Sequence, residues 1–371
     1  MNHSTDLPIL EMEVLEGMSP WPPSLTGEEL FGVLVAWSDQ NQGGLIYLAT
    51  DQQNPPNQPL VVNPKWTSWD TPAIAIALEW ERVYLAWTDD TGAINLANSG
   101  DGWDTEIKIA PAGSSSSDTG PALTFGIELL FIAWTTPKGL LSIATCDKKG
   151  TIKCYPTQCS ALSRPSLAWS DGHVLYALSG GPLNGDDPMR FYFSRDEGQS
   201  FGELYGPKDP CLGPPSLVVL NDYFYLVWAD AKTSCLNFVV TQNLEDCTAI
   251  QYSNACHGGG PALISVGDEL NVGWSILAPP EDPTAHHLAL GKLPISKPGP
   301  SMDKDKYAKR EQARAPDPCP DPMSVYDPAQ DKCVPKGGCY GACVLGSFMP
   351  FGLFNPIKYA ACVIACKSHT K

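Results

Sequence analysis

The sequence predicts an all-β fold, a six-bladed β-propeller followed by a small C-terminal cysteine-rich α-hairpin module. Three observations support this prediction. An apolar strand that ends in an aromatic residue recurs six times, at intervals of 42 to 52 residues, the length of one four-stranded blade. Glycine (33 residues) and proline (35 residues) are abundant and only 18% of residues are charged, which is typical of short strands joined by turns. Finally, six of the thirteen cysteines lie within residues 319–366.

The six copies of the repeat read FGVLVAWSD, RVYLAWTDD, LLFIAWTTP, HVLYALSGG, YFYLVWADA and LNVGWSILA. Their shared aromatic position is expected at Trp37, Trp87, Trp134, Tyr176, Trp228 and Trp274. Equivalent aromatic residues in every blade usually fill the space between neighbouring sheets, because each buries a large apolar area there. We therefore expect these side chains to be core rather than platforms that stack on sugars.

Each copy after the first follows an opening strand that begins beside proline: DTPAIAIA, DTGPALTF, SRPSLAWS, GPPSLVVL and GGPALISV. Proline suits the first residue of a strand, where its missing N–H does no harm. Closing the sheets into a ring removes exposed sheet edges. The propeller is expected to span residues 25–296. In the N-terminal segment, residues 1–24, the stretch Pro8–Leu15 alternates like a strand and is expected to complete the last blade.

A turn motif stands between the third and fourth strands of the fourth copy, Ser194-Arg195-Asp196-Glu197-Gly198-Gln199-Ser200-Phe201. Serine and aspartate side chains hydrogen-bond backbone groups, glycine permits a positive φ, and the aromatic ring packs back into the blade. The motif resembles the Asp-box, S-x-D-x-G-x-[ST]-[WF], of sialidase-like (BNR-repeat) propellers, and residues 25–295 resemble lectin-like members of that family. The resemblance implies structural roles for Ser194, Asp196, Gly198 and Phe201.

The turns between the second and third strands, with the links between blades, are expected to share one face, where the resemblance places function. The candidate ligand-binding residues are Asp39, Asp89, Asp90, Thr135 and Asp230 from the turns and Asp70, Asp118, Arg164 and His257 from the links. Short polar side chains suit sugar hydroxyls, although any solvated turn contains them too. We predict a glycan or another small polar ligand, with no cofactor and no metal.

Sialidase chemistry is not expected. The family resemblance would require three arginines that clamp a carboxylate, a tyrosine nucleophile with a glutamate partner, and an acid/base aspartate. Residues 1–300 contain four arginines, of which Arg82 begins a strand at the opposite edge and Arg195 belongs to the Asp-box-like turn. A FRIP-like motif is absent, as are HExxH, GxSxG and P-loop motifs. A sialidase-like glycoside hydrolase is the second alternative.

Charge and cysteine content constrain partners and compartment. Residues 1–300 carry 14 Lys+Arg against 34 Asp+Glu, so this acidic body repels phosphate backbones and nucleic-acid partners are not expected. The N-terminus shows neither a basic n-region nor an apolar h-region, and no run of 18 apolar residues follows. The dense cysteines nevertheless favour an extracellular or cell-surface location.

The tail is expected to be a separate unit. Residues 297–318 have the proline-rich, charged composition of a linker, and residues 319–371 that of a disulfide-stapled helical hairpin. The candidate disulfide residues are Cys319, Cys333, Cys339, Cys343, Cys362 and Cys366; the last four form two CxxxC pairs, each on one helical face. The segment resembles cysteine-rich α-hairpin peptides. From Lys332 onward it holds five lysines and no acids.

Together these features favour a non-catalytic recognition propeller that binds carbohydrate, with a tail for self-association or attachment to a membrane surface. The alternative from a different class is a toxin or bacteriocin-like protein. In that hypothesis the C-terminal hairpin acts on membranes and the propeller targets or restrains it.

Overall fold

A computed structural model divides the chain into two compact units, Met1–Ile295 and Ser296–Lys371. The residues that the structure describes are 12–18, 23–28, 32–39, 42–50, 59–68, 70–116, 119–170, 174–180, 189–207, 211–220, 223–242, 244, 249–256, 260–267, 269–277, 286–293, 324–327 and 332–335.

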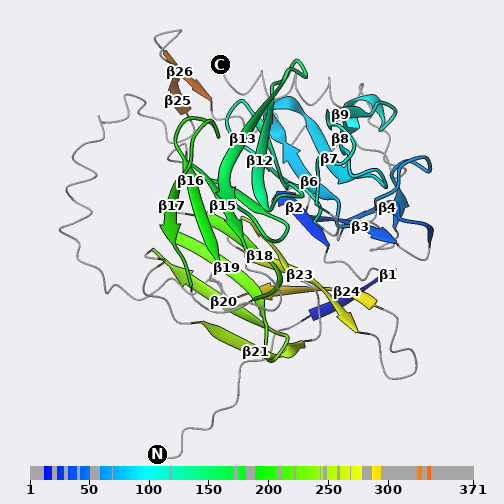
Figure 1. Cartoon of the computed structure of the whole chain (residues 1–371), viewed down its shortest axis with the longest axis vertical. Helices are drawn as coiled ribbons and strands as arrows, with labels where there is room; N and C mark the ends of the chain where they lie inside the picture. The colour runs from blue at the N-terminus through cyan, green and yellow to red at the C-terminus, as the bar shows by residue number, and fades with distance from the viewer. Residues whose placement is uncertain are drawn as a thin grey trace, which may run out of the picture. The chain divides into compact units, whose positions relative to one another are not determined.

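The described residues of the first unit form six antiparallel four-stranded sheets arranged as a propeller, which confirms the predicted fold class (Figure 1). Blade 1 contains β2 (Ser24–Glu28), β3 (Gly32–Asp39), β4 (Leu45–Thr50) and β5 (Leu60–Val61). Blade 2 contains β6 (Ala73–Ala77), β7 (Arg82–Thr88), β8 (Ile94–Asn98) and β9 (Ile107–Ala110), with 3₁₀ turns η2 (Leu78–Trp80) and η3 (Ser99–Asp101). Blade 3 contains β10 (Ala122–Phe125), β11 (Leu130–Thr135), β12 (Leu140–Cys146) and β13 (Ile152–Ser160).

Blade 4 contains β14 (Ser166–Ser170), β15 (Val174–Ser179), β16 (Arg190–Ser194) and β17 (Gly202–Tyr205). Blade 5 contains β18 (Cys211–Leu220), β19 (Tyr223–Asp230), β20 (Cys235–Thr241) and β21 (Ile250–Cys256). Blade 6 contains β22 (Ala262–Val266), β23 (Glu269–Leu277) and β24 (His286–Leu293), and its fourth strand is β1 (Met12–Met18) from the other end of the unit.

The pairing of β1 with β24 joins the two ends of the propeller. Met12 lies opposite Gly291 and Leu15 opposite Leu288 in antiparallel register, and Figure 1 shows β1 beside β24. The strand contains residues 12–15 of the Pro8–Leu15 stretch that alternates in the sequence and continues to Met18, while residues 8–11 lie outside the described residues. Because β1 pairs with β24, this sheet contains both the first and the last strands of the ring.

The six inner strands begin at the same end of the propeller axis and follow one layered plan. A buried proline precedes the paired part of each strand, at Pro23, Pro72, Pro121, Pro165, Pro215 and Pro261. Two positions after each proline stands an aliphatic residue, at Leu25, Ile74, Leu123, Leu167, Leu217 and Leu263. An inner strand pairs on one side only, so a proline there removes no ladder hydrogen bond.

Hydroxyl groups cross from one blade to the exposed backbone edge of the next. Ser166 Oγ accepts the N–H of Leu217 at 3.0 Å, and Ser216 Oγ accepts the N–H of Leu263 at 2.9 Å. Ser24 Oγ accepts the N–H of Ile74 in the same way, at 3.2 Å. These serines directly follow their prolines and occupy equivalent positions in blades 1, 4 and 5. Each bond satisfies an edge N–H group that the sheet ladder cannot reach.

Buried aromatic residues fill the interfaces between blades. Trp37, Trp87, Trp134, Trp228 and Trp274 are at most 5% exposed, and each belongs to a cluster that joins its blade to the preceding one. The prediction that these tryptophans are core is therefore confirmed. Full burial of a side chain this large contributes on the order of 3 kcal/mol to stability.

The aromatic position predicted in blade 4 was wrong. Ser166 lies opposite Leu178, as Ala122 lies opposite Ala133, so Ser179 is the residue equivalent to Trp134. Tyr176 instead packs edge-on against Phe224, toward blade 5. Aligning Tyr176 with the tryptophans of the other copies misplaced this blade in the repeat. The interface between blades 3 and 4 contains a different aromatic pair, Phe131 stacked on Trp169.

The second unit contributes one described hairpin, β25 (Ser324–Asp327) paired with β26 (Lys332–Pro335). The predicted helical hairpin and the side chains of its candidate disulfide residues lie outside the described residues. In the first unit, Cys235 is disulfide-bonded, whereas Cys146, Cys154 and Cys159 are free thiols. Among the described residues, no helix is long and apolar enough to cross a membrane.

Candidate functional site

One face of the propeller, called here the polar-turn face, carries the turns between second and third strands and the links between blades. Seven of the nine candidate ligand-binding residues are described on it. Asp118 and His257 lie outside the described residues. The seven fall into three groups: Asp89 and Asp230 build their own turns, Thr135, Asp90 and Asp39 are turn residues that differ in exposure, and Asp70 and Arg164 lie near one another in the links.

Asp89 and Asp230 build the turns that contain them. Asp89 Oδ1 accepts the N–H groups of Thr91 at 2.9 Å and Ala93 at 3.0 Å, and Oδ2 accepts the Asn95 amide at 3.1 Å. Asp230 Oδ1 similarly accepts the N–H groups of Lys232 and Thr233, at 2.9 and 2.8 Å. Burial raises the pKa of each carboxyl, but these hydrogen bonds outweigh it and leave both pKa values lowered.

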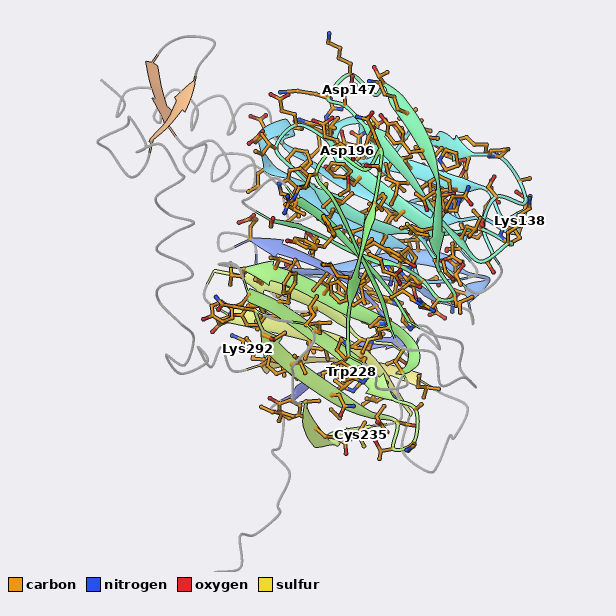
Figure 2. All side chains as sticks on the ribbon, turned by 60° about the vertical axis from the view of Figure 1, so that its left-hand side comes forward. Lys138, Asp147, Asp196, Trp228, Cys235 and Lys292 are labelled. Carbon is orange, nitrogen blue, oxygen red and sulfur yellow. The ribbon has the colours of Figure 1, made fainter. Side chains whose placement is uncertain are left out.

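The same turn occurs on the opposite end of the propeller. Asp147, between β12 and β13, accepts the N–H groups of Lys149 at 2.9 Å and Thr151 at 2.8 Å, and Gly150 has a positive φ, as Gly92 has after Asp89. Figure 2 shows Asp147 well apart from Lys138, which belongs to the turn at the other end of β12. An aspartate that begins such a turn is explained by backbone satisfaction alone, wherever it lies.

The remaining turn candidates differ in exposure. Thr135 is 2% exposed, and its hydroxyl donates to the Ser163 carbonyl oxygen at 2.6 Å, which ties blade 3 to the link that follows it. Asp90 is exposed at the tip of the β7–β8 turn. Asp39 is partly exposed at the end of β3, where burial first and then the Asp39 charge raise the pKa of Tyr47.

Arg164 and Asp70 are the two candidates that lie near one another at the axis. From the link before blade 4, Arg164 Nε donates to the Pro121 carbonyl at 2.8 Å and Nη2 donates to the Pro72 carbonyl at 3.3 Å, so one side chain connects blades 4, 3 and 2. Burial lowers the pKa of Arg164 to about 10 and the nearby Asp70 carboxylate raises it, so the guanidinium is charged at neutral pH. Asp70 is 4% exposed and its main-chain carbonyl accepts the Ser38 hydroxyl at 2.8 Å.

The other arginines of residues 1–300 lie elsewhere. Arg190 pairs with Glu203 at 3.0 Å between the outer strands of blade 4. Arg195 lies over the Phe193 ring, 5.6 Å from its centroid. Arg82 begins β7 at the end of the blade opposite the polar-turn face. Arg164 therefore has no second arginine beside it among the described residues.

The turn that resembles an Asp-box is closed by its own side chains. Ser194 Oγ accepts the N–H of Gly198 at 2.8 Å and donates to Asp196 Oδ1, also at 2.8 Å. Asp196 then accepts the N–H and hydroxyl groups of Ser200 at 2.9 and 2.6 Å. Phe201 packs against the cluster between blades 3 and 4. These contacts account for all four residues without a ligand.

No group of three or more potential metal-ligating side chains occurs among the described residues. The sequence reasoning also missed two features. The cross-blade serines and the bridging role of Arg164 both depend on contacts between segments some 45 to 90 residues apart. The sequence does contain a pattern that could have predicted the serine bonds, since serine follows the strand-opening proline in three copies and alanine in the other three.

Comparisons with known proteins show the fold. No protein-family model matches the sequence, and no curated protein matches it. Solved structures do. The sialidase of Trypanosoma rangeli, in complex with 2,3-difluorosialic acid, superposes with a TM-score of 0.51 at 11% identity, over 74% of this chain and 54% of the sialidase. This chain therefore spans little more than half the length of that enzyme.

Two further structures are similar. The Hadza microbial sialidase Hz136 has a TM-score of 0.52 at 12% identity and covers 74% of this chain and 65% of its own. An α-L-arabinanase of Penicillium chrysogenum, complexed with arabinobiose, has a TM-score of 0.51 at 13% identity and covers 76% of this chain and 98% of its own. At these identities the likeness establishes a six-bladed propeller and leaves the chemistry to the residues of this chain.

Two equivalent threonines test whether the polar-turn face is held by its buried hydroxyls. Thr135→Val should lower the free energy of unfolding by about 1–3 kcal/mol, because it leaves the Ser163 carbonyl unsatisfied. Thr88 follows Trp87 as Thr135 follows Trp134, but its buried hydroxyl has no hydrogen-bond partner among the described residues. Thr88→Val should therefore be neutral or stabilising by up to about 1 kcal/mol. Urea unfolding measures the free energy of unfolding of both variants, and an equal loss of stability in the two would contradict this interpretation.

The pH dependence of stability tests the Ser194–Phe201 turn. The Ser200 hydroxyl and N–H lower the pKa of Asp196, so its contribution to stability is complete above the unfolded-state pKa of about 3.9 and is lost as pH falls through the lower folded-state pKa. Asp196→Asn should lower the melting temperature at pH 7, and the gap from wild type should close toward pH 2.5. Thermal unfolding from pH 7 to 2.5 measures this. The exposed Asp104→Asn is the control, and a gap independent of pH would exclude the mechanism.

Proposed function

We propose that this chain is a non-catalytic recognition propeller that binds carbohydrate on the polar-turn face. The observation that carries the proposal is the state of Arg164. Its guanidinium is engaged by two main-chain carbonyls, and no second arginine lies beside it among the described residues. A three-arginine clamp for a substrate carboxylate is therefore not assembled from these residues, which supports binding without sialidase chemistry.

The polar-turn face offers groups that suit sugar hydroxyls. Asp90 is exposed and Asp39 is partly exposed, on the turns of adjacent blades 1 and 2. Carboxylates accept two or more hydrogen bonds each, and short turn side chains present them without a large loss of conformational entropy. The similar solved structures include a sialidase bound to a sialic acid derivative and an arabinanase bound to arabinobiose, which supports a sugar as the ligand class.

The tail is proposed to serve assembly or surface attachment. The excess of lysine over acids from Lys332 onward supports this role, since an anionic surface or the acidic propeller of a second copy attracts it. An extracellular or cell-surface location fits the disulfide at Cys235.

A glycan array probed with the full chain tests the proposal. We expect saturable binding to at least one glycan class, weakened about tenfold or more by Asp90→Ala, because a lost hydrogen bond to a charged group costs about 1.5–3 kcal/mol. The exposed Asp104→Ala, in blade 2 but outside the polar-turn face, is the matched control. An array without any binding would refute carbohydrate recognition. Turnover of 4-methylumbelliferyl sialoside by the same preparation would refute the absence of catalysis.

A further inference from the structure

The axis of the propeller encloses a cavity of about 630 Å³, walled by the six inner strands. This volume is within the range of small-molecule sites. Of the described candidate residues of the polar-turn face, Arg164 lines the cavity, whereas Asp39, Asp70 and Asp90 do not. Its two ends differ in how closely the chain segments approach one another and in the charge of their side chains.

At the end where the inner strands begin, the links are packed against each other. A Cβ atom at Gly120 would collide with the Thr71 carbonyl oxygen, and one at Gly260 would collide with the Pro214 carbonyl oxygen. Arg164 lines this end and is bonded across to blades 2 and 3. Only glycine permits such close backbone approach, so neighbouring links pack tightly at this end.

At the other end, the walls are apolar and partly aromatic. The ring of equivalent residues one position before the ends of most inner strands reads Gly27, Ile76, Phe125, Trp169, Val219 and Ser265, all of which line the cavity. Both aromatic rings are held in place: Trp169 stacks on Phe131 with centroids 5.2 Å apart, and Phe125 meets Trp80 edge-on at 4.8 Å. Beyond this ring, Ile127 is 45% exposed, so the wall continues to the solvent.

Among the described residues, the charged side chains that line this mouth are two carboxylates, Glu28 and Glu79. Burial, and then repulsion from Glu128, raises the pKa of Glu79, whereas the Lys148 ammonium lowers it. Lys148 lies beside the mouth and donates to the Glu79 carbonyl oxygen at 3.5 Å, but it does not line the cavity. The acidic body of the propeller attracts cations to this mouth.

We infer that this mouth of the axial cavity is a second binding site, and that it takes an organic ammonium group carried on an aromatic or aliphatic body. Glu28 and Glu79 hold the ammonium group, and the Phe125 and Trp169 rings contact the apolar body and the face of the cation. Arg164 at the far end excludes a second positive charge, so the ligand enters body first and leaves its ammonium group at the mouth.

Isothermal titration calorimetry of the full chain with benzylammonium tests the inference. We expect saturable binding of one equivalent that weakens as salt is added, with benzyl alcohol binding less tightly and phenylacetate not at all. Glu79→Gln should weaken benzylammonium binding about threefold, and the Glu28→Gln/Glu79→Gln double variant about tenfold, as expected for a partly exposed charge pair.

The exposed Glu106→Gln is the matched control, because it removes the same charge from blade 2 without touching the cavity, and it should leave binding unchanged. Trp169→Leu should also weaken binding. A melting profile of this variant that matches the wild-type profile will show that the variant is folded. Absence of saturable binding would overturn the inference. So would an affinity for benzylammonium that Glu106→Gln lowers as much as Glu79→Gln, or an equal affinity for phenylacetate.

Discussion

The propeller depends on how the inner edge of each blade is satisfied. Every inner strand pairs on one side only, so half of its N–H and C=O groups face the axis rather than a neighbouring strand. Serine hydroxyls cover this edge between blades 1 and 2, 4 and 5, and 5 and 6. Arg164 spans blades 2, 3 and 4, where alanine replaces serine after the proline in blades 2 and 3. The arginine thus joins two of the three interfaces that lack a serine hydroxyl, and the third is the interface between blades 6 and 1, where Ala262 follows the proline.

Arg164 has a structural role that also carries an energetic cost. A guanidinium that is largely surrounded by protein loses hydration, and two carbonyl bonds together with the Asp70 charge offset that loss. Because its donors are turned toward the protein, the same residue is a poor candidate for a clamp on a ligand. The axis consequently has one end lined by Arg164 and another end lined by apolar side chains with Glu28 and Glu79, and the two ends suit different ligands.

Much of the fold was predictable from the sequence, because a repeat of about 47 residues fixes the number of blades and the alternation of apolar residues fixes their strands. The buried tryptophans followed from the same repeat. Blade 4 was misaligned since Ser179 replaces the expected aromatic residue, and strand register is a tertiary property that no single strand encodes.

The candidate site was less predictable. Polar residues at turns have the same sequence pattern whether they bind a ligand or their own backbone. For Asp89 and Asp230, the hydrogen bonds from backbone N–H groups of the turn show that they bind their own backbone. The sequence predicted that Asp70 and Arg164 share one face, but it did not predict that they lie near each other. Their neighbours, the Pro72 and Pro121 carbonyls, are backbone groups that carry no sequence signal.

Amide hydrogen exchange along the inner strands tests the central claim most directly. The N–H groups of Leu217 and Leu263 are bonded to serine hydroxyls of the preceding blade, whereas the equivalent Leu123 and Leu167 follow blades that present Ala73 and Ala122. We predict slow exchange at Leu217 and Leu263, close to the limit of global unfolding, and faster exchange at Leu123 and Leu167. Equal rates at all four amides would contradict the account.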